Sequence, residues 1–390
     1  MRYAGFASQL QKELPDWVSA GLVTVEQSEA LSLRYGAGYA MERRRSRAVQ
    51  AIALIGAVAA GLGVILFFAA NWDAISRPTR VVLLLAALLG SYAAGSMTLQ
   101  RRPLVGHSLI LLGAIAFGAG IFLVGQMYHV QAHDPLAFAL WSAGVAPLAW
   151  IMRSRPLASL TLLTLGAWVV FEGIDAVGDS SYDANYLVIP LAVLLYGGAL
   201  YGAGTSLGAR LSWASGPMRG IGYTLAWGGT FVLTFGALHS EVEGAQLGQP
   251  MTRLLVVLGI LALAGAASLL VARGRESAVW EALVLGAAAT LGLATALAPA
   301  PPVATTILFN LLLAALALGA VVVGYREDEL WLATSGLAVV AIDVFARFLD
   351  LSWGLLPRST AFLGAGLLLI ALAFVLERGR SRLAAGMAAR

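Results

Sequence analysis

Long apolar runs recur along this chain, and they restrict its possible folds more than any other feature. Each run holds about 20 residues, enough for a helix to cross a hydrocarbon core of about 30 Å. Apolar residues make up 59% of the 390 residues and charged residues 12%, against about 45–50% and about 25% in soluble domains. A soluble fold of this size would lack the polar surface that keeps it dissolved. The sequence therefore predicts an all-α fold, a polytopic transmembrane helix bundle.

The predicted helices group into three regions. Residues 1–48 form a short cytoplasmic helical hairpin, residues 49–377 the transmembrane helical domain, and residues 378–390 a basic cytoplasmic tail. About 12 spans are predicted, and the shortness of the fifth leaves open whether it crosses fully. The spans are 49–70, 79–99, 104–127, 135–152, 157–171, 185–205, 218–239, 252–272, 278–298, 303–324, 329–349 and 359–377.

The arginines alternate between loops in a way that predicts the orientation of the chain. Short cytoplasmic loops of membrane proteins are enriched in Lys and Arg. Every second predicted loop carries such residues here, as with Arg101, Arg153, Arg210, Arg273 and Arg326. Acidic residues gather in loops of the opposite side. We therefore expect an even number of spans with both termini in the cytoplasm.

Residues 1–48 carry the signals of two short helices. Gly21 suits the left-handed conformation that ends a helix. Thr24 and Gln27 have the spacing of a capping box, which opens a second helix with Leu31 on its apolar face. The apolar stripe of this hairpin must pack on itself, on a second copy of the chain or on the membrane. A docking or regulatory module and a passive amphipathic leader both remain open.

The composition excludes several kinds of chemistry. Cysteine is absent, so disulfides, thiolate catalysis and cysteine-ligated metals are excluded. Lys12 is the single lysine, and it does not belong to a Walker-type phosphate loop. No Gly-x-Ser-x-Gly nucleophile motif occurs. We expect no cofactor and no nucleic-acid partner, and we interpret the net charge of +4 as a topology signal.

A few polar side chains lie inside the predicted spans, where they are costly and by default mark function. In the eleventh span Asp343 precedes Arg347 by four residues, the favourable order for an ion pair on one helix face. Since most such groups lie toward the extracytoplasmic side, we expect a water-accessible polar pocket that opens there. The alternative is a structural ion pair surrounded by ordinary loop polarity. The candidate ligand-binding residues are Gln126, Tyr128, His129, Glu172, His239, Asn310, Asp343 and Arg347.

His129, His133 and Asp134 form a weak candidate metal site. Histidines four residues apart share a face only on a helix. The proline that follows, and the position at the end of a predicted span, predict a loop instead. We therefore expect no metal, and we expect His129 to hydrogen bond with Tyr128 and Gln126 or to respond to pH, since histidine titrates near neutrality.

Short motifs in the first half of the chain carry a family resemblance. They are residues 17–24 (WVSAGLVT), 68–75 (FAANWDAI), 126–129 (QMYH) and the pair Leu140-Trp141. Over roughly residues 10–170 the chain resembles a bacterial membrane-protein family known as domain of unknown function 2157. The family has no established activity, so the resemblance implies only a bacterial inner-membrane protein with a small N-terminal cytoplasmic segment. It also singles out polar motif residues at the outer end of the first span, namely Asn71, Trp72 and Asp73.

The sequence leaves three functions open. The leading hypothesis is transport or binding of a small solute or lipid through the outward-facing polar pocket. The second is a membrane scaffold or sensor that contacts cytoplasmic partners, or a second copy, through residues 1–48. The third is an intramembrane enzyme acting on a lipid-linked substrate, which the missing nucleophile motifs disfavour. In each case membrane lipids surround the chain, while the ligand and the oligomeric state stay open.

Overall fold

The computed structural model describes residues 10, 13–32, 75–128, 135–177, 185–208, 210–240, 249–271, 278–298, 301–355 and 358–388. The chain divides into two compact units, Met1–Arg80 and Val81–Arg390. Several predicted features lie outside the described residues, and these are the first span at 49–70, the motif residues Asn71, Trp72 and Asp73, and the metal candidates His129, His133 and Asp134.

The N-terminal unit contains two short helical segments, residues 13–19 and 25–32. Gly21 between them has φ of 70°, the left-handed conformation predicted for it. The Thr24 N–H donates to Gln27 Oε1 (3.0 Å), and the Gln27 N–H donates to Thr24 Oγ1 (3.3 Å). These reciprocal bonds confirm the capping box. The hairpin as a domain of residues 1–48, and its docking or regulatory role, stay predictions.

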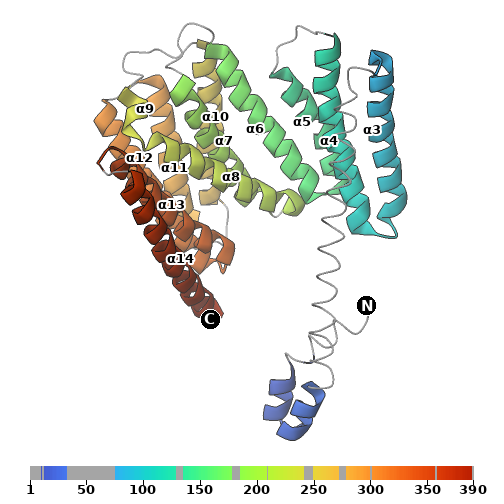
Figure 1. The fold of residues 1–390 in the computed structure, drawn as a ribbon, viewed down its shortest axis with the longest axis vertical. Coiled ribbons are helices and arrows are strands. Elements are labelled where there is room, and N and C mark those ends of the chain that lie inside the picture. Colours follow the sequence, from blue (N-terminus) through green and yellow to red (C-terminus); the bar gives the residue numbers. More distant parts are fainter. Residues whose placement is uncertain are drawn as a thin grey trace. The chain divides into compact units, whose positions relative to one another are not determined.

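All secondary structure in the described part of the chain is helical (Figure 1). From residue 77 onward a helix lies at the position of each predicted span, which fits the apolar runs that define them. The helices are α3 (Arg77–Leu99), α4 (Pro103–Tyr128), α5 (Leu136–Met152), α6 (Arg155–Val177), α7 (Asn185–Ser206), α8 (Ser212–Leu233), α9 (Gly236–Ser240), α10 (Gln249–Val271), α11 (Ala278–Leu297), α12 (Pro302–Arg326), α13 (Leu330–Leu355) and α14 (Arg358–Ala388).

Nine of the described helices are long and apolar enough to cross a membrane. The α5 helix is apolar but has only 17 residues, and α8 is too polar to count among the nine. The predicted total of about 12 spans is therefore not confirmed. The α6 helix covers 23 residues and extends at both ends beyond the short span predicted at 157–171.

The span predicted at 218–239 is wrong in its boundaries. The α8 helix begins at Ser212 and ends at Leu233, and the short helix α9 follows at Gly236. The apolar run continues across this break, so hydropathy alone placed the span too late. The chain leaves the helix at Thr234, whose carbonyl oxygen accepts hydrogen bonds from side chains of α12 and α13.

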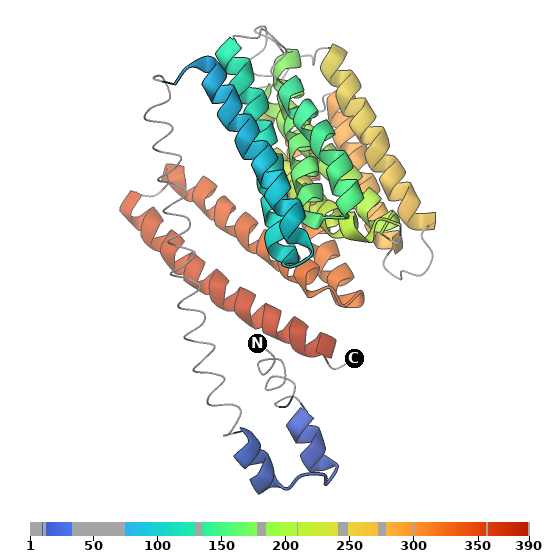
Figure 2. The ribbon, with the colours of Figure 1, turned by 90° about the vertical axis from the view of Figure 1, so that its right-hand side faces the viewer.

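Among the described helices of the second unit, α7 and α8 pack against each other most extensively. They run antiparallel, since Gly229 lies against Pro190 and Leu194 near one end while Gly204 lies against Met218 near the other. Small residues along such an interface let two helix backbones approach closely. The α7 helix also packs against α6, α10 and α11, and most of its residues are buried. By contrast α14 packs along α13 with little burial (Figures 1 and 2).

Trp141 of α5 joins the helices of the region that carries the family motifs. Its indole Nε1–H donates to the Ala114 carbonyl oxygen of α4 (2.9 Å). The ring also covers Gly118, where a side chain would collide with it. Because the Ala114 carbonyl is part of the backbone of α4, this hydrogen bond fixes the position of α5 along α4.

Replacing Trp141 with phenylalanine is expected to reduce the free energy of unfolding by about 1–2 kcal/mol, because it removes one hydrogen bond and part of the packed ring. The measurement is the thermal unfolding of the purified protein in detergent. Trp150→Phe is the matched control, since Trp150 is 63% exposed and phenylalanine keeps an aromatic ring against Trp213, so the substitution should cost under about 0.5 kcal/mol. Equal losses in the two variants would show that the indole bond contributes nothing.

Candidate functional site

The break between α8 and α9 is held by polar side chains from two other helices. Arg347 of α13 donates through Nη2 to the carbonyl oxygen of Thr234 (3.4 Å), to the hydroxyl of the same residue, and to Asn310 Oδ1 of α12 (3.1 Å). Asn310 in turn donates through Nδ2 to the carbonyl oxygens of Thr234 (3.1 Å) and Thr306 (2.8 Å). The Thr234 carbonyl, which lies where the helix is unwound between α8 and α9, therefore accepts hydrogen bonds from side chains of two other helices.

Asp343 supplies the negative charge beside Arg347. The two residues are one helical turn apart, with 3.4 Å between Arg347 Nε and Asp343 Oδ1, and about a third of each side chain is exposed (32% and 29%). This contact is an ion pair without hydrogen-bond geometry, because within the described residues Asp343 Oδ1 is buried and accepts no hydrogen bond. The guanidinium also stacks over the ring of Phe235, 4.5 Å from its centroid.

His239 completes the arrangement from the α9 side. Its side chain is buried, with Nε2 lying 2.8 Å from the carbonyl oxygen of Leu233, the last residue of α8. The imidazole stacks on Phe309 of α12 with 6.0 Å between ring centroids. We call the set Thr234, Phe235, His239, Asn310, Asp343 and Arg347 the break-site network.

The break-site network lies deep along its helices. Asp343 is the fourteenth residue of the 26-residue helix α13, and the helix continues to Leu355. At a rise of about 1.5 Å per residue, about 18 Å separate Asp343 from that end of the helix. If the helix ended at residue 349, as the sequence predicts, the distance from Asp343 to that end would be about 9 Å. The ion pair therefore lies farther from the end of α13 than the sequence indicates.

The predicted site residues fall into two places. His239, Asn310, Asp343 and Arg347 come together, as described above, on α9, α12 and α13. Gln126 and Tyr128 lie near the end of α4 and Glu172 lies on α6, and α4 packs against α5 and α6. The structure therefore places the described candidate residues in two groups on different helices, and their role in binding a ligand stays a prediction.

The α3–α6 region has a large hollow of its own. A groove of about 1050 Å³ runs between α3, α4 and α5 and reaches Phe171 of α6. Its walls are almost entirely apolar, for example Leu88, Phe117 and Phe138, and Gln126 is a polar exception. Tyr128, Glu172 and the break-site network do not line it.

A second polar cluster lies near the start of α8 and was missed by sequence reasoning. Arg219 of α8 donates two parallel hydrogen bonds to Glu329, the residue immediately before α13, with distances of 2.6 Å for Nη1–Oε1 and 2.5 Å for Nη2–Oε2. Only 12% of the arginine side chain and 25% of the glutamate side chain are exposed. The guanidinium also lies over the rings of Tyr201 (5.9 Å) and Trp331 (5.7 Å).

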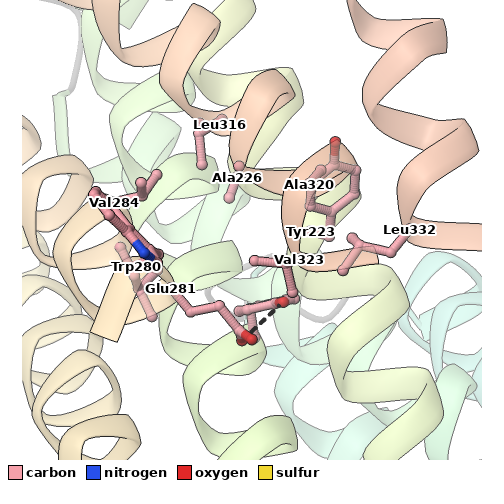
Figure 3. Close-up of a pocket in the computed structure, with 12 residues that line it drawn as sticks. Tyr223, Ala226, Trp280, Glu281, Val284, Leu316, Ala320, Val323 and Leu332 are labelled. Carbon is pink, nitrogen blue, oxygen red and sulfur yellow. Dashed lines mark hydrogen bonds between the residues drawn. The ribbon is translucent and has the colours of Figure 1, made fainter. Parts of the chain in front are cut away.

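Beside this ion pair the structure has a small cavity. The hydroxyl of Tyr201 on α7 donates to Glu281 Oε2 on α11 (3.1 Å), and both residues line the cavity (Figure 3). Its volume is about 60 Å³. The residues of this cluster are far apart in the sequence, so no spacing pattern predicts that they meet.

No three His, Asp or Glu side chains of the described residues are placed to hold a metal ion. The weak candidates His129, His133 and Asp134 lie outside those residues, so the prediction about them is not tested.

Long apolar helices, with ion pairs and polar clusters between them, define a multi-pass integral membrane protein. Residues 15–158 match the family model described as predicted membrane protein (DUF2157), which confirms the resemblance found in the motifs of the first half of the chain. The match includes α3, α4 and α5 but neither of the two polar clusters. No curated protein and no solved structure matches the chain.

Proposed function

We propose that this protein binds and transports a small solute or lipid headgroup, and that the break-site network is its binding site. The observation that carries the proposal is the helix break at Thr234, where an unwound carbonyl meets the Asp343–Arg347 ion pair deep along α13. Discontinuous helices with unwound carbonyls form the substrate and ion sites of many secondary transporters. Charged residues at membrane depth mark such pathways by default.

The hydrogen bonding of the break-site network supports a site that can open. Arg347 is held by neutral acceptors, Thr234 and Asn310, which a solute acceptor such as a carboxylate or phosphate oxygen could replace. Asp343 Oδ1 is a buried acceptor to which none of the described residues donates. Such a group calls for an explanation, and a donor on the solute provides one. We therefore propose a solute that carries both an acceptor for Arg347 and a donor for Asp343.

We also propose that both termini lie in the cytoplasm and that the break-site network opens to the opposite side. The ring contact of Trp150 with Trp213 (6.0 Å) brings the α5–α6 turn next to the start of α8. The Arg219–Glu329 pair brings α8 next to the α12–α13 turn. These connections gather arginine-bearing turns at one end, which supports a cytoplasmic placement for that end. Their arginines are Arg153, Arg155, Arg210 and Arg326.

The test is ligand-dependent thermal stabilisation of the purified protein in detergent, with glycine, lactate and glycerol 3-phosphate as probes. A probe present at ten times its dissociation constant should stabilise the folded state by about 1.4 kcal/mol. We expect Asp343→Asn and Arg347→Gln to abolish this stabilisation. Asp350→Asn is the matched control, because Asp350 is an exposed carboxylate on the same helix.

Two results would count against the site. One is a stabilising probe whose effect persists in both Asp343→Asn and Arg347→Gln. The other is the absence of any stabilisation by these probes together with no uptake of them into proteoliposomes.

A further inference from the structure

The cavity beside the Arg219–Glu329 pair has an unusual lining for so small a space. Three of its residues are aromatic, Tyr201, Tyr223 and Trp280, and Glu281 contributes a carboxylate. The rest of the wall is aliphatic and comes from α8, α11, α12 and α13. In Figure 3 Trp280 and Tyr223 lie on opposite sides, with the Glu281 carboxylate below and between them.

We propose that this cavity binds a small ammonium group, either a quaternary ammonium or a protonated amine. Aromatic rings attract cations through the negative potential of their faces, and aromatic cages are a common way to recognise quaternary ammonium groups. A carboxylate in the same cavity adds a full opposite charge in a region of low dielectric. Anions and neutral apolar groups would gain nothing from Glu281.

The size of the cavity fits this ligand class. One water molecule, which has one non-hydrogen atom, needs about 10–15 Å³ of cavity volume. The cavity of about 60 Å³ therefore accommodates about four to six non-hydrogen atoms. A trimethylammonium or tetramethylammonium group has that number of atoms. The Tyr201 hydroxyl donates to Glu281 Oε2 and thereby holds the carboxylate in one orientation.

The nearby arginine does not turn the cavity into an anion site. Both Nη atoms of Arg219 are occupied by Glu329, so the two charges balance within their own pair.

The ammonium group can belong to a free solute or to a phospholipid headgroup. Trp280 lies in the first turn of α11 and is 56% exposed, so the cavity has a wall at the protein surface near a helix end. Amphipathic rings of this kind favour the headgroup region of a bilayer. This site is separate from the break-site network and shares no residue with it.

The experiment measures binding of tetramethylammonium to the purified full chain in detergent by isothermal titration calorimetry. The neutral analogue tert-butanol has the same number of non-hydrogen atoms and should not bind. Glu281→Gln keeps the shape of the side chain and should weaken binding by about tenfold or more. Trp280→Leu should weaken tetramethylammonium binding by about threefold, and the fold should stay intact because Trp280 is exposed.

Control variants test whether the loss of binding is specific to the cavity, and lipid discs distinguish a lipid headgroup from a free solute as the occupant. Glu377→Gln makes the same chemical change on the exposed surface of α14, and Asp343→Asn alters only the break-site network, so both should bind tetramethylammonium like the unmodified chain. Weaker tetramethylammonium binding in discs with phosphatidylethanolamine than in discs of phosphatidylglycerol alone identifies the lipid headgroup as occupant, and equal binding identifies a free solute. Failure to bind, equal binding of tert-butanol, or unchanged affinity in both Glu281→Gln and Trp280→Leu would overturn the proposal.

Discussion

Replacing Arg219 with methionine is expected to reduce the free energy of unfolding by about 3 kcal/mol, one of the two largest effects that the structure predicts. The substitution leaves Glu329 without the two hydrogen bonds that it now accepts, while its side chain stays largely buried. Breaking a buried ion pair costs about 3–5 kcal/mol, mostly because the remaining charge is left uncompensated. The exposure of 25% at Glu329 places the expected loss at the lower end of that range.

A double-mutant cycle separates this pairing from other effects of the arginine. Glu329→Gln alone should also destabilise the protein, whereas Arg219→Met combined with Glu329→Gln should recover part of the loss, because no buried charge is then left unpaired. Stability is measured by thermal or denaturant unfolding in the same detergent. Arg326→Met is the control, since Arg326 is exposed at the end of α12 and should change stability by under about 0.5 kcal/mol. Strictly additive losses would mean that the pair is not coupled.

The positions of the helices could be read from the sequence, because each depends on a local property of the chain. An apolar run of sufficient length forms a helix in lipid, where every backbone N–H and C=O must be bonded within the segment. Hydropathy predicts a helix at the position of each described helix from α3 to α14 except the short helix α9. It failed at Thr234, where the helix ends inside an apolar run because its carbonyl is bonded from α12 and α13.

The composition of the polar clusters could be predicted only where the partners are close in sequence. Asp343 and Arg347 lie on one helix face and were identified together. Arg219 and Glu329 are 110 positions apart, and Tyr201 and Glu281 are 80 apart. Their meeting depends on which helices are neighbours and at what register, and neither is encoded in spacing along one chain.

The same limit explains why the candidate binding residues fall into two groups on different helices. Gln126, Tyr128 and Glu172 were grouped with the Asp343–Arg347 pair because all lie toward the same predicted membrane side. Depth in the membrane is readable from the sequence, whereas position around the bundle is not. The packing of α4 against α5 and α6 places Gln126 on a different part of the unit from α12 and α13.

The Gly229→Ala substitution is expected to destabilise the protein strongly, because it adds a methyl group between the closely packed helices α7 and α8. A Cβ atom at Gly229 would lie 2.5 Å from the Pro190 carbonyl oxygen and 2.6 Å from the Leu194 backbone nitrogen, both on α7. Backbone atoms cannot rotate aside, so the two helices must separate. Overpacking of this kind costs about 1–3 kcal/mol or more, and it would also disturb the neighbouring break at Thr234.

Gly228→Ala is the control, and its expected effect on the free energy of unfolding is opposite to that of Gly229→Ala. A Cβ atom at Gly228 meets nothing within 4 Å, so the added methyl group only improves helix propensity. Alanine is more favourable than glycine inside a helix by about 0.8–1 kcal/mol, so this variant should match or exceed the stability of the unmodified chain. The two adjacent positions thus isolate helix contact from helix propensity, with thermal unfolding in detergent as the measurement. Similar shifts at both positions would mean that α7 and α8 do not approach at Gly229, and the packing that fixes the start of the break-site network would then need revision.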